Sequence, residues 1–232
     1  MIMMIGECTE HGYYRNDDNR KICPVCGEEG KFIMNDFEIE KIGRIMAAAL
    51  RHGKYNVDLD NNGYTTVGSI LDAVKSRNPR MGWLRPRHIE AIVITDPKGR
   101  YEISGNKIRA TYGHTVELDV PLDYDDVPEE LFYPTSDEEA DNLLDNGIDP
   151  SGRAMVHLSR TYADAKRAGS VHCDDPIILL IDVEQAAEGG CRIGRASKTV
   201  YLCGHVPAES IYVAEPEDYD TEAADGAAEG DE

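Results

Sequence analysis

Four residues near the N-terminus have the types and the spacing of a zinc-binding set. Cys8 and His11 are separated by two residues, and so are Cys23 and Cys26. Two such pairs, each on a tight turn, can direct four donor atoms at one tetrahedral Zn²⁺. Since four protein ligands leave no position for a reacting water, we expect a structural metal in a zinc ribbon spanning residues 1–33. The alternative is a set of reduced cysteines that hold no metal.

A second set of residues combines arginine with histidine in three short motifs. Arg51 and His52 are adjacent, Arg109 is followed by Gly113-His114-Thr115, and Arg153 is followed by Val156-His157-Leu158-Ser159. Guanidinium groups stay protonated and bind phosphate oxygens through two parallel hydrogen bonds, and imidazole titrates near neutral pH. These residue types therefore suit the handling of a phosphate group. Each one taken alone is more typical of a surface ion pair or a structural hydrogen bond.

The first two motifs fall in a module that we expect over residues 34–118. Apolar residues recur with helical spacing after Asn35, which has capping-box spacing to Glu38, and Gly53 stands where the helix should stop. The arginine and histidine of the first motif then close this helix, where its dipole favours cations. The elements expected next are an extended piece over 63–67, helices over 67–75 and 87–95, and a hairpin formed by 101–103 and 107–110. This order is typical of a winged helix.

After residue 119 the sequence pattern changes to short strands with few helices. We expect strands over 131–134, 154–158, 177–183, 200–202 and 210–213, and helices over 137–145 and 162–168. These elements predict a β-rich second domain over residues 119–214, and an α+β chain overall. The sequence contains no Walker loop, no GxGxxG and no GxSxG motif, so it lacks the commonest signatures of nucleotide binding and hydrolysis.

Charge is distributed unevenly along the 232 residues, whose net charge is −20. Residues 123–145 hold ten acids without a base and are expected to form a solvated linker leading into a helix; residues 215–232 hold nine acids and are expected to form a disordered tail. Between Lys75 and Arg109, nine Lys or Arg face three acids, which indicates an anionic partner bound at one place.

Composition also excludes several classes of protein. Hydrophobic residues make up 41% of the chain, enough for packed cores, but no apolar run approaches the roughly 18 residues of a membrane span. Six cysteines in a chain of this length do not form a disulfide scaffold. We therefore expect a cytoplasmic protein with no membrane partner, and exclude fibrous, membrane and secreted classes.

Taken together, the motifs resemble those of the RNA 2′-phosphotransferase family, which is NAD-dependent and tRNA 2′-phosphotransferase-like. The resemblance covers about residues 38–213, and its motifs occur in the family's order: Leu50-Arg51-His52, Ile108-Arg109-Ala110 with Gly113-His114-Thr115, Arg153-x-x-Val156-His157-Leu158-Ser159, and Val200-Tyr201-Leu202 with Val206-Pro207. The resemblance implies an N-terminal winged-helix lobe that binds RNA and a C-terminal, ADP-ribosyltransferase-like lobe that binds NAD⁺. The zinc ribbon is an addition to this plan.

The reaction that the resemblance implies removes an internal 2′-phosphate from RNA and consumes NAD⁺ as co-substrate. The 2′-phosphate attacks the nicotinamide ribose and releases nicotinamide, giving a 2′-phospho-ADP-ribosylated RNA. The neighbouring ribose hydroxyl then attacks phosphorus and releases ADP-ribose 1″,2″-cyclic phosphate. The best-known substrate of the family is tRNA with a splice-junction 2′-phosphate, and we expect a monomer by default.

The resemblance also implies roles for individual residues. The catalytic residues would be Arg51, His52, Arg109 and Arg153, which must converge on one phosphoryl group. The NAD⁺ contacts would be Thr135, Ser136, Gly147, Ile148, His157 and Ser159. The RNA contacts would be Gly113, His114 and Thr115. The sequence departs from the family at Phe132-Tyr133-Pro134-Thr135, where many relatives have Tyr-His-Gly-Thr, and has Gly-His-Thr where they have Gly-His-Ser.

Two other functions are compatible with parts of the sequence. An ADP-ribosyltransferase that stops after the first step would cap nucleic-acid phosphate ends with ADP-ribose; four retained cationic positions argue against it, because the second step needs them most. A non-catalytic nucleic-acid-binding regulator would explain the zinc ribbon and the winged helix, but would leave Arg153 and its His-Leu-Ser motif without a role.

Overall fold

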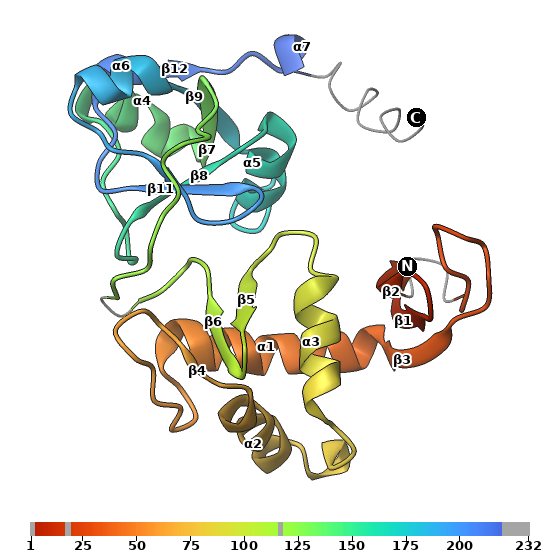
Figure 1. The fold of residues 1–232 in the computed structure, drawn as a ribbon. Helices are drawn as coiled ribbons and strands as arrows, with labels where there is room; N and C mark the ends of the chain where they lie inside the picture. Colours follow the sequence, from red (N-terminus) through yellow and green to blue (C-terminus); the bar gives the residue numbers. More distant parts are fainter. Residues whose placement is uncertain (1–2, 17–19, 116–117, 220–232) are drawn as a thin grey trace. The chain divides into compact units, whose positions relative to one another are not determined.

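The computed structural model describes residues 3–16, 20–115 and 118–219, and the chain forms two compact units, residues 1–121 and 122–232 (Figure 1). Both units combine helices with antiparallel sheet, in agreement with the predicted α+β class. Among the described helices, none combines the length and the apolar character needed to cross a membrane.

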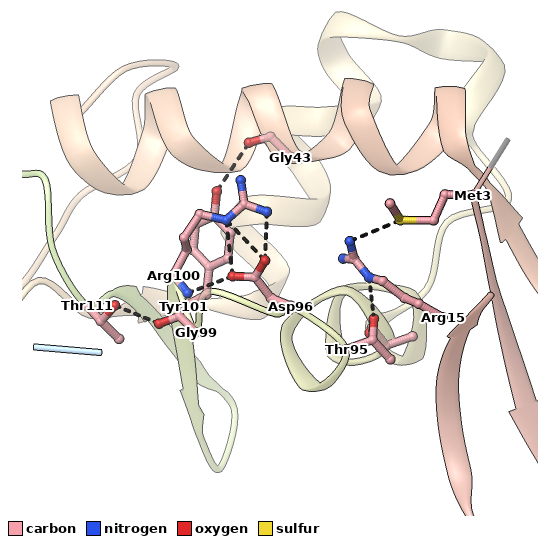
Figure 2. A network of polar contacts seen from close by, with 10 residues as sticks. Met3, Arg15, Gly43, Thr95, Asp96, Gly99, Arg100, Tyr101 and Thr111 are labelled. Atoms are coloured by element: carbon pink, nitrogen blue, oxygen red, sulfur yellow. Dashed lines mark hydrogen bonds and ion pairs between the residues drawn. The ribbon is translucent and has the colours of Figure 1, made fainter. Parts of the chain in front are cut away.

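The first unit begins with a three-stranded sheet of order β2-β1-β3, formed by β1 (Met4–Cys8), β2 (Gly12–Asn16) and β3 (Lys31–Asn35). Ile5 and Met34 of this sheet are fully buried in the same core as the helices that follow. Figure 2 shows a polar tie between the two parts: Arg15 donates from Nε to Thr95 Oγ1 over 3.0 Å. The N-terminal sheet is thus packed onto the helical part of the unit and does not stand apart from it.

Strand β3 leads directly into the long helix α1 (Asp36–His52). The capping box between Asn35 and Glu38 is present, and Gly53 ends the helix in the left-handed region with φ 58°. Both helix signals predicted from the sequence are therefore confirmed. They matter for function because they fix the last turn of α1, where Arg51 and His52 lie.

The remainder of the first unit contains β4 (Thr65–Thr66), α2 (Val67–Arg77), the 3-10 turn η1 (Pro79–Met81), α3 (Pro86–Ile94), β5 (Tyr101–Ser104) and β6 (Lys107–Ala110). The strands form a sheet of order β4-β6-β5. The predicted hairpin is present, with Ser104 paired to Lys107 across a turn of two residues. Tyr101 anchors the hairpin on α1 by donating its hydroxyl to the Gly43 carbonyl over 3.3 Å (Figure 2).

The second unit is built on a six-stranded sheet of order β10-β11-β8-β7-β9-β12. Its strands are β7 (Glu130–Thr135), β8 (Val156–Ser159), β9 (Ile177–Asp182), β10 (Gly194–Arg195), β11 (Val200–Cys203) and β12 (Ile211–Val213). Its helical elements are α4 (Asp137–Asn146), α5 (Tyr162–Gly169), α6 (Val183–Glu188), the 3-10 turn η2 (Ala208–Ser210) and α7 (Pro216–Tyr219). The expected β-rich character is confirmed, whereas β10 and α6 were not expected.

Two acidic segments differ from their sequence expectation. The segment beginning at Asp123 is tied to β10: Arg195 forms ion pairs with Asp123 and Asp126, and residues 123 and 195 also form a β-bridge. The start of the expected tail is helix α7, where Tyr219 stacks on Tyr162 with ring centroids 5.5 Å apart. Aromatic stacking thus extends the packed unit to residue 219. The rest of the expected tail, 220–232, lies outside the described residues.

Candidate anion-binding site and metal centre

The four N-terminal metal-ligand candidates lie together in the first unit. Their donor atoms all fall within 4.8 Å of one another. Cys8 Sγ is 3.5 Å from His11 Nδ1 and 3.8 Å from Cys26 Sγ, and Cys23 Sγ is 3.8 Å from the same His11 nitrogen. Tetrahedral zinc, with bonds of about 2.3 Å to sulfur and about 2.0 Å to nitrogen, places neighbouring ligand atoms roughly 3.5–3.8 Å apart. The three separations given lie close to that geometry, and the remaining pairs of donor atoms lie within 4.8 Å.

The backbone around Cys8 favours the thiolate form that a metal requires. The amide groups of Glu10 and His11 point at the sulfur and, together with the His11 side chain, lower the pKa of Cys8 to about 6. A thiol that ionises below neutral pH binds a divalent metal without a large proton-release penalty. Both the donor geometry and this environment therefore suit Zn²⁺.

A separate cluster of cations lies at the C-terminal end of α1. His52 Nδ1 is 3.0 Å from Thr115 Oγ1, and the Thr115 amide donates to the Arg51 carbonyl over 3.1 Å. The Arg51 guanidinium lies over the Tyr112 ring, 4.7 Å from its centroid. Partial burial and the charges of Lys54 and Arg51 lower the pKa of His52, so its imidazole is neutral at pH 7. These contacts bring together the first predicted motif and the segment of the second.

Arg109 reaches this region from β6 and is held by two side chains. Its Nε and Nη2 donate to Glu102 Oε2 over 3.0 and 2.6 Å, and the Tyr64 hydroxyl donates to Glu102 Oε1 over 2.7 Å. The Tyr64 ring also lies under the guanidinium, 4.7 Å from it. Hydrogen bonds from Tyr64 and Arg109 hold the pKa of Glu102 below its usual range despite the opposing effect of partial burial. Glu102 therefore stays ionised and fixes the orientation of the Arg109 fork.

His114 is buried beside these arginines, with 8% of its surface exposed. Burial, followed by the charges of Arg51, Arg109 and His52, lowers the pKa of His114 to about 4. A protonated imidazole in this position would add a further positive charge to an already cationic cluster. His114 is therefore neutral at physiological pH.

Several nitrogen atoms of this cluster are buried and have no hydrogen-bond partner among the described residues: Arg51 Nε and Nη2, Arg109 Nη1 and His114 Nε2. Each buried polar group left unsatisfied costs roughly 1–3 kcal/mol. An oxyanion with several acceptor oxygens can satisfy such groups together, and guanidinium forks match phosphate geometry. The arrangement is therefore a candidate phosphate-binding site, which we call the cation cluster.

Gly113 allows the backbone to pass close to the cluster. Its φ is +83°, and a Cβ at this position would meet Arg51 Nε and Cζ at 3.2 Å. Both the left-handed backbone and the close approach favour glycine over any residue with a side chain. The predicted RNA contact at residue 113 thus coincides with a position that shapes the cluster through its backbone.

In the second unit, Thr135 and Ser136 link the end of β7 to α4. Thr135 Oγ1 is buried and has no hydrogen-bond partner among the described residues. Ser136 is the N-cap residue of α4, but its side chain makes no capping hydrogen bond. Two hydroxyl groups at the end of a strand are thus left to contact a ligand. They are polar groups of the kind that hold ribose or pyrophosphate oxygens.

The other predicted cofactor contacts of this unit differ in what they offer. His157 Nδ1 lies 2.9 Å from the Met155 carbonyl, so this nitrogen carries a proton, and Ser159 is nearly buried on β8. Ile148 is 1% exposed, and its amide and carbonyl both bond Val206, so it offers no free polar group to a ligand. Gly147 has φ +85°, and a Cβ there would lie 2.4 Å from the Val206 carbonyl.

Arg153 belongs to the second unit, in the exposed segment before β8. Among the described residues it forms no ion pair, and its charge opposes the burial that raises the pKa of Tyr133. Arg153 therefore lies on the same unit as the predicted NAD⁺ contacts. The first unit holds the other three predicted catalytic residues: Arg51, His52 and Arg109.

Sequence reasoning missed the residues that orient the arginines: Tyr64, Glu102 and Tyr112. Glu102 had a usable signal, because it pairs with Arg109 across the hairpin. A two-residue turn at Gly105 and Asn106 sets that register. The strands expected from the sequence, 101–103 and 107–110, leave a turn of three residues and therefore do not predict this pairing. The two tyrosines carry no comparable local signal, since their rings meet the guanidinium groups only after the chain has folded.

Comparison with known proteins gives a consistent result. Residues 38–205 match a family model described as "RNA 2'-phosphotransferase, Tpt1 / KptA family". The chain is 41% identical over 213 residues to the "Probable RNA 2'-phosphotransferase" of Thermoplasma acidophilum, covering 90% of this chain and 88% of the relative. It is 36% identical to the protein of the same name from Methanosarcina mazei, over 91% of this chain and all of the relative. "Probable RNA 2'-phosphotransferase 1" of Archaeoglobus fulgidus is 39% identical over 209 residues, 88% of this chain and 92% of the relative.

Proposed function

This chain belongs to the RNA 2′-phosphotransferase, Tpt1 / KptA family, and on that premise we propose that it removes an internal 2′-phosphate from RNA by transferring it to NAD⁺. The products would be RNA with a free 2′-hydroxyl, nicotinamide and ADP-ribose 1″,2″-cyclic phosphate. One observation carries the proposal: nitrogens of Arg51, Arg109 and His114 are buried without a hydrogen-bond partner among the described residues, and an oxyanion would satisfy them. The 2′-phosphate of the substrate is that oxyanion.

The cation cluster suits both steps of this reaction. Arg51 and Arg109 would hold the phosphate dianion, and their permanent charge would stabilise the negative charge that develops on its oxygens in the second step. Because Glu102 occupies two N–H groups of Arg109, the remaining nitrogen has a defined direction. Such preorganised donors lower the barrier without rearranging during the reaction.

His52 would act on the departing RNA oxygen as hydrogen-bond donor or general acid. It is neutral without a ligand, because partial burial and the nearby cations Lys54 and Arg51 lower its pKa. A bound phosphate dianion supplies the opposite charge and raises that pKa, so proton donation becomes possible once substrate is bound. Its contact with Thr115 fixes the ring orientation from the Nδ1 side.

We assign NAD⁺ binding to the second unit, which would correspond to an ADP-ribosyltransferase-like domain of residues 119–214. NAD⁺ supplies the ribose that accepts the phosphate and the nicotinamide leaving group. Two hydroxyl groups support this assignment: that of Thr135, which has no hydrogen-bond partner among the described residues, and that of Ser136, which does not cap α4. The remaining NAD⁺ contacts would be Gly147, Ile148, His157 and Ser159. Arg153 would be the catalytic residue that this unit contributes, beside Arg51, His52 and Arg109 of the first unit's sequence.

The first unit would then combine a structural zinc ribbon over residues 1–33 with a winged-helix RNA-binding domain over 34–118. The proposal further takes a splice-junction tRNA as substrate, a monomer as the working state and the cytoplasm as the compartment. It also includes residues 113–115 as RNA contacts. The adjacency of Gly113 and Thr115 to Arg51 supports this last assignment.

The test is incubation of the full chain with an RNA that carries one internal 2′-phosphate, with and without NAD⁺. Phosphate loss and nicotinamide release should appear together and only with NAD⁺, and cyclic phosphate should be the co-product. A stable ADP-ribosyl adduct would instead indicate a transferase that stops after the first step.

Variants of two arginines on the same helix complete the test. Arg51→Ala should lower turnover by about 100-fold or more, equivalent to roughly 3 kcal/mol of transition-state stabilisation. Arg44→Ala is the matched control, because Arg44 is exposed and pairs with Glu40. Full activity of Arg51→Ala, Arg109→Ala and Arg153→Ala alike would refute the assignment.

A further inference from the structure

A second concentration of positive charge runs from the end of α2, through the connection, to the first turn of α3. Figure 1 shows where this connection lies in the first unit. Residues 75–89 contain five Lys or Arg and no acid, in a chain whose net charge is −20. We call this region the α2–α3 basic surface, and its cations are Lys75, Arg77, Arg80, Arg85 and Arg87. Such a local excess in an acidic chain calls for an anionic partner.

These charges lie at the surface and have no acidic partner among the described residues. The four arginines are exposed, and within the described part of the chain none of the five cations forms an ion pair. Two of them are nevertheless held in place: Arg77 lies over the Tyr55 ring at 4.7 Å, and Arg85 donates to the carbonyls of Gly82 and Leu84 over 2.8 Å. Two of the five positive charges are therefore held in a fixed place, and all five lack an acidic partner within the described ranges.

The basic surface is distinct from the cation cluster, although both lie in the first unit. Helix α2 starts beside the hairpin that carries Arg109, because the Val67 amide donates to the Asn106 carbonyl over 2.9 Å. The basic surface is at the other end of that helix, which at 1.5 Å per residue is about 16 Å long. A ligand that reaches both places must be extended.

We infer that the α2–α3 basic surface binds the phosphodiester backbone of the RNA substrate at a distance from the reacting 2′-phosphate, an inference that rests on the proposed function. Four of the five cations are arginines, whose planar forks bind phosphate oxygens bidentately. Trp83 stands among them, 37% exposed and set edge-on to His88, with ring centroids 4.9 Å apart. An exposed aromatic ring between arginines is the arrangement on which an unpaired base stacks while its backbone is held.

The experiment compares two double variants that remove the same charge. Arg80→Ala/Arg87→Ala removes two exposed arginines of the surface that make no side-chain hydrogen bond among the described residues. Arg44→Ala/Arg167→Ala is the matched control, because both arginines are exposed and lie on helices elsewhere. Each double variant of the full chain is assayed with two substrates: a trinucleotide with a central 2′-phosphate, and a hairpin RNA of about 30 nucleotides with one internal 2′-phosphate. At roughly 3.4 Å per stacked nucleotide, only the hairpin RNA is long enough to reach both the cation cluster and the basic surface.

For the hairpin RNA, we expect the basic-surface variant to bind roughly tenfold more weakly than the wild type, and the dependence of log K on log salt to become less steep by about 1.5. For the trinucleotide, turnover should equal that of the wild type, because this substrate is too short to reach both places. The control variant should match the wild type with both RNAs.

Equal hairpin affinity and equal salt slopes for the two double variants would overturn the inference and would direct the search to an acidic protein partner. Equal losses on both RNAs would overturn it as well, since the surface would then act through folding. If the wild type releases no phosphate from either RNA, the proposed function fails, while the binding arm still decides whether the basic surface contacts RNA.

Discussion

Acidification should destabilise the first unit through His114, whose pKa is lowered from 6.5 to about 4 by burial and by the neighbouring cations Arg51, Arg109 and His52. Between pH 6.5 and pH 4 the unfolded chain is protonated at this histidine and the folded chain is not. The unfolded state therefore binds more protons, and the free energy of unfolding falls as the pH falls through this window. Above pH 6.5 the contribution of His114 is constant.

The magnitude follows from the two pKa values. The difference between 6.5 and about 4, at 1.36 kcal/mol per pH unit, gives a loss of about 3 kcal/mol on reaching pH 4. His114 is 8% exposed, so solvent screening reduces this value little. A loss of that size is a large share of the 5–15 kcal/mol by which domains are usually stable.

The assay is urea unfolding at several pH values, followed by fluorescence. Trp83 is the sole tryptophan and belongs to the first unit, so its emission reports that unit alone. His114→Gln should lose about 3 kcal/mol less than the wild type between pH 6.5 and pH 4. His205→Gln is the control, because His205 is half-exposed in the second unit. Parallel losses in the wild type and His114→Gln would refute the reasoning.

Binding of an anion supplies an independent check of the same site. Inorganic phosphate placed among Arg51, Arg109 and His114 offsets part of their positive charge and removes a reason for the low pKa. The NMR titration midpoint of the His114 ring should therefore rise when phosphate is added. A midpoint that phosphate leaves unchanged would contradict anion binding in the cation cluster.

Two further predictions concern the metal and the backbone at the cluster. We expect the wild type to bind one equivalent of zinc, and Cys26→Ser to bind none and to melt at a lower temperature, because one of four clustered ligands is gone. Cys173→Ser should match the wild type in both respects. Metal analysis and thermal unfolding measure this, and equal zinc content in Cys26→Ser and Cys173→Ser would exclude the site. Gly113→Ala should weaken phosphate binding by about tenfold, because the added Cβ would meet the Arg51 side chain at 3.2 Å. Gly105→Ala is the control: its φ is +60° and its Cβ would have no neighbour within 4 Å, so it should lose only about 1 kcal/mol of stability. Calorimetry that finds equal phosphate affinities for the two variants would contradict the role of Gly113.

Local signals explain why the first unit was largely predictable from the sequence. A capping box, a stop glycine and paired ligands at short spacing each act over a few residues, so α1 and the metal cluster follow directly from the sequence. The placement of Arg51 and His52 at the end of α1 follows from the same signals. Their convergence with Arg109 and His114 depends on tertiary packing; the family resemblance implied convergence with Arg109 and Arg153, whereas it placed His114 among the RNA contacts.

The elements missed in the second unit are those without a periodic signal. Strand β10 has two residues and α6 has six, too few to show a helical or an alternating pattern. The ion pairs of Arg195 with Asp123 and Asp126 join segments about 70 residues apart, so an acidic stretch that resembled a free linker is in part fixed to the sheet. Long-range pairing of this kind is invisible to local composition.

The presence of an acid beside a phosphate site needs a physical reason, because Glu102 partly neutralises Arg109. A guanidinium free to rotate would pair with any nearby carboxylate in so acidic a chain, and its geometry would vary. Glu102 occupies Nε and Nη2, Tyr64 supports the face of the fork, and Nη1 is left without a partner in the described part of the chain. In this exchange, Glu102 weakens the electrostatic attraction between Arg109 and an anion but leaves the guanidinium with a single donor direction. Because transition-state stabilisation depends on preorganised donors more than on net charge, this exchange favours turnover over tight ground-state binding.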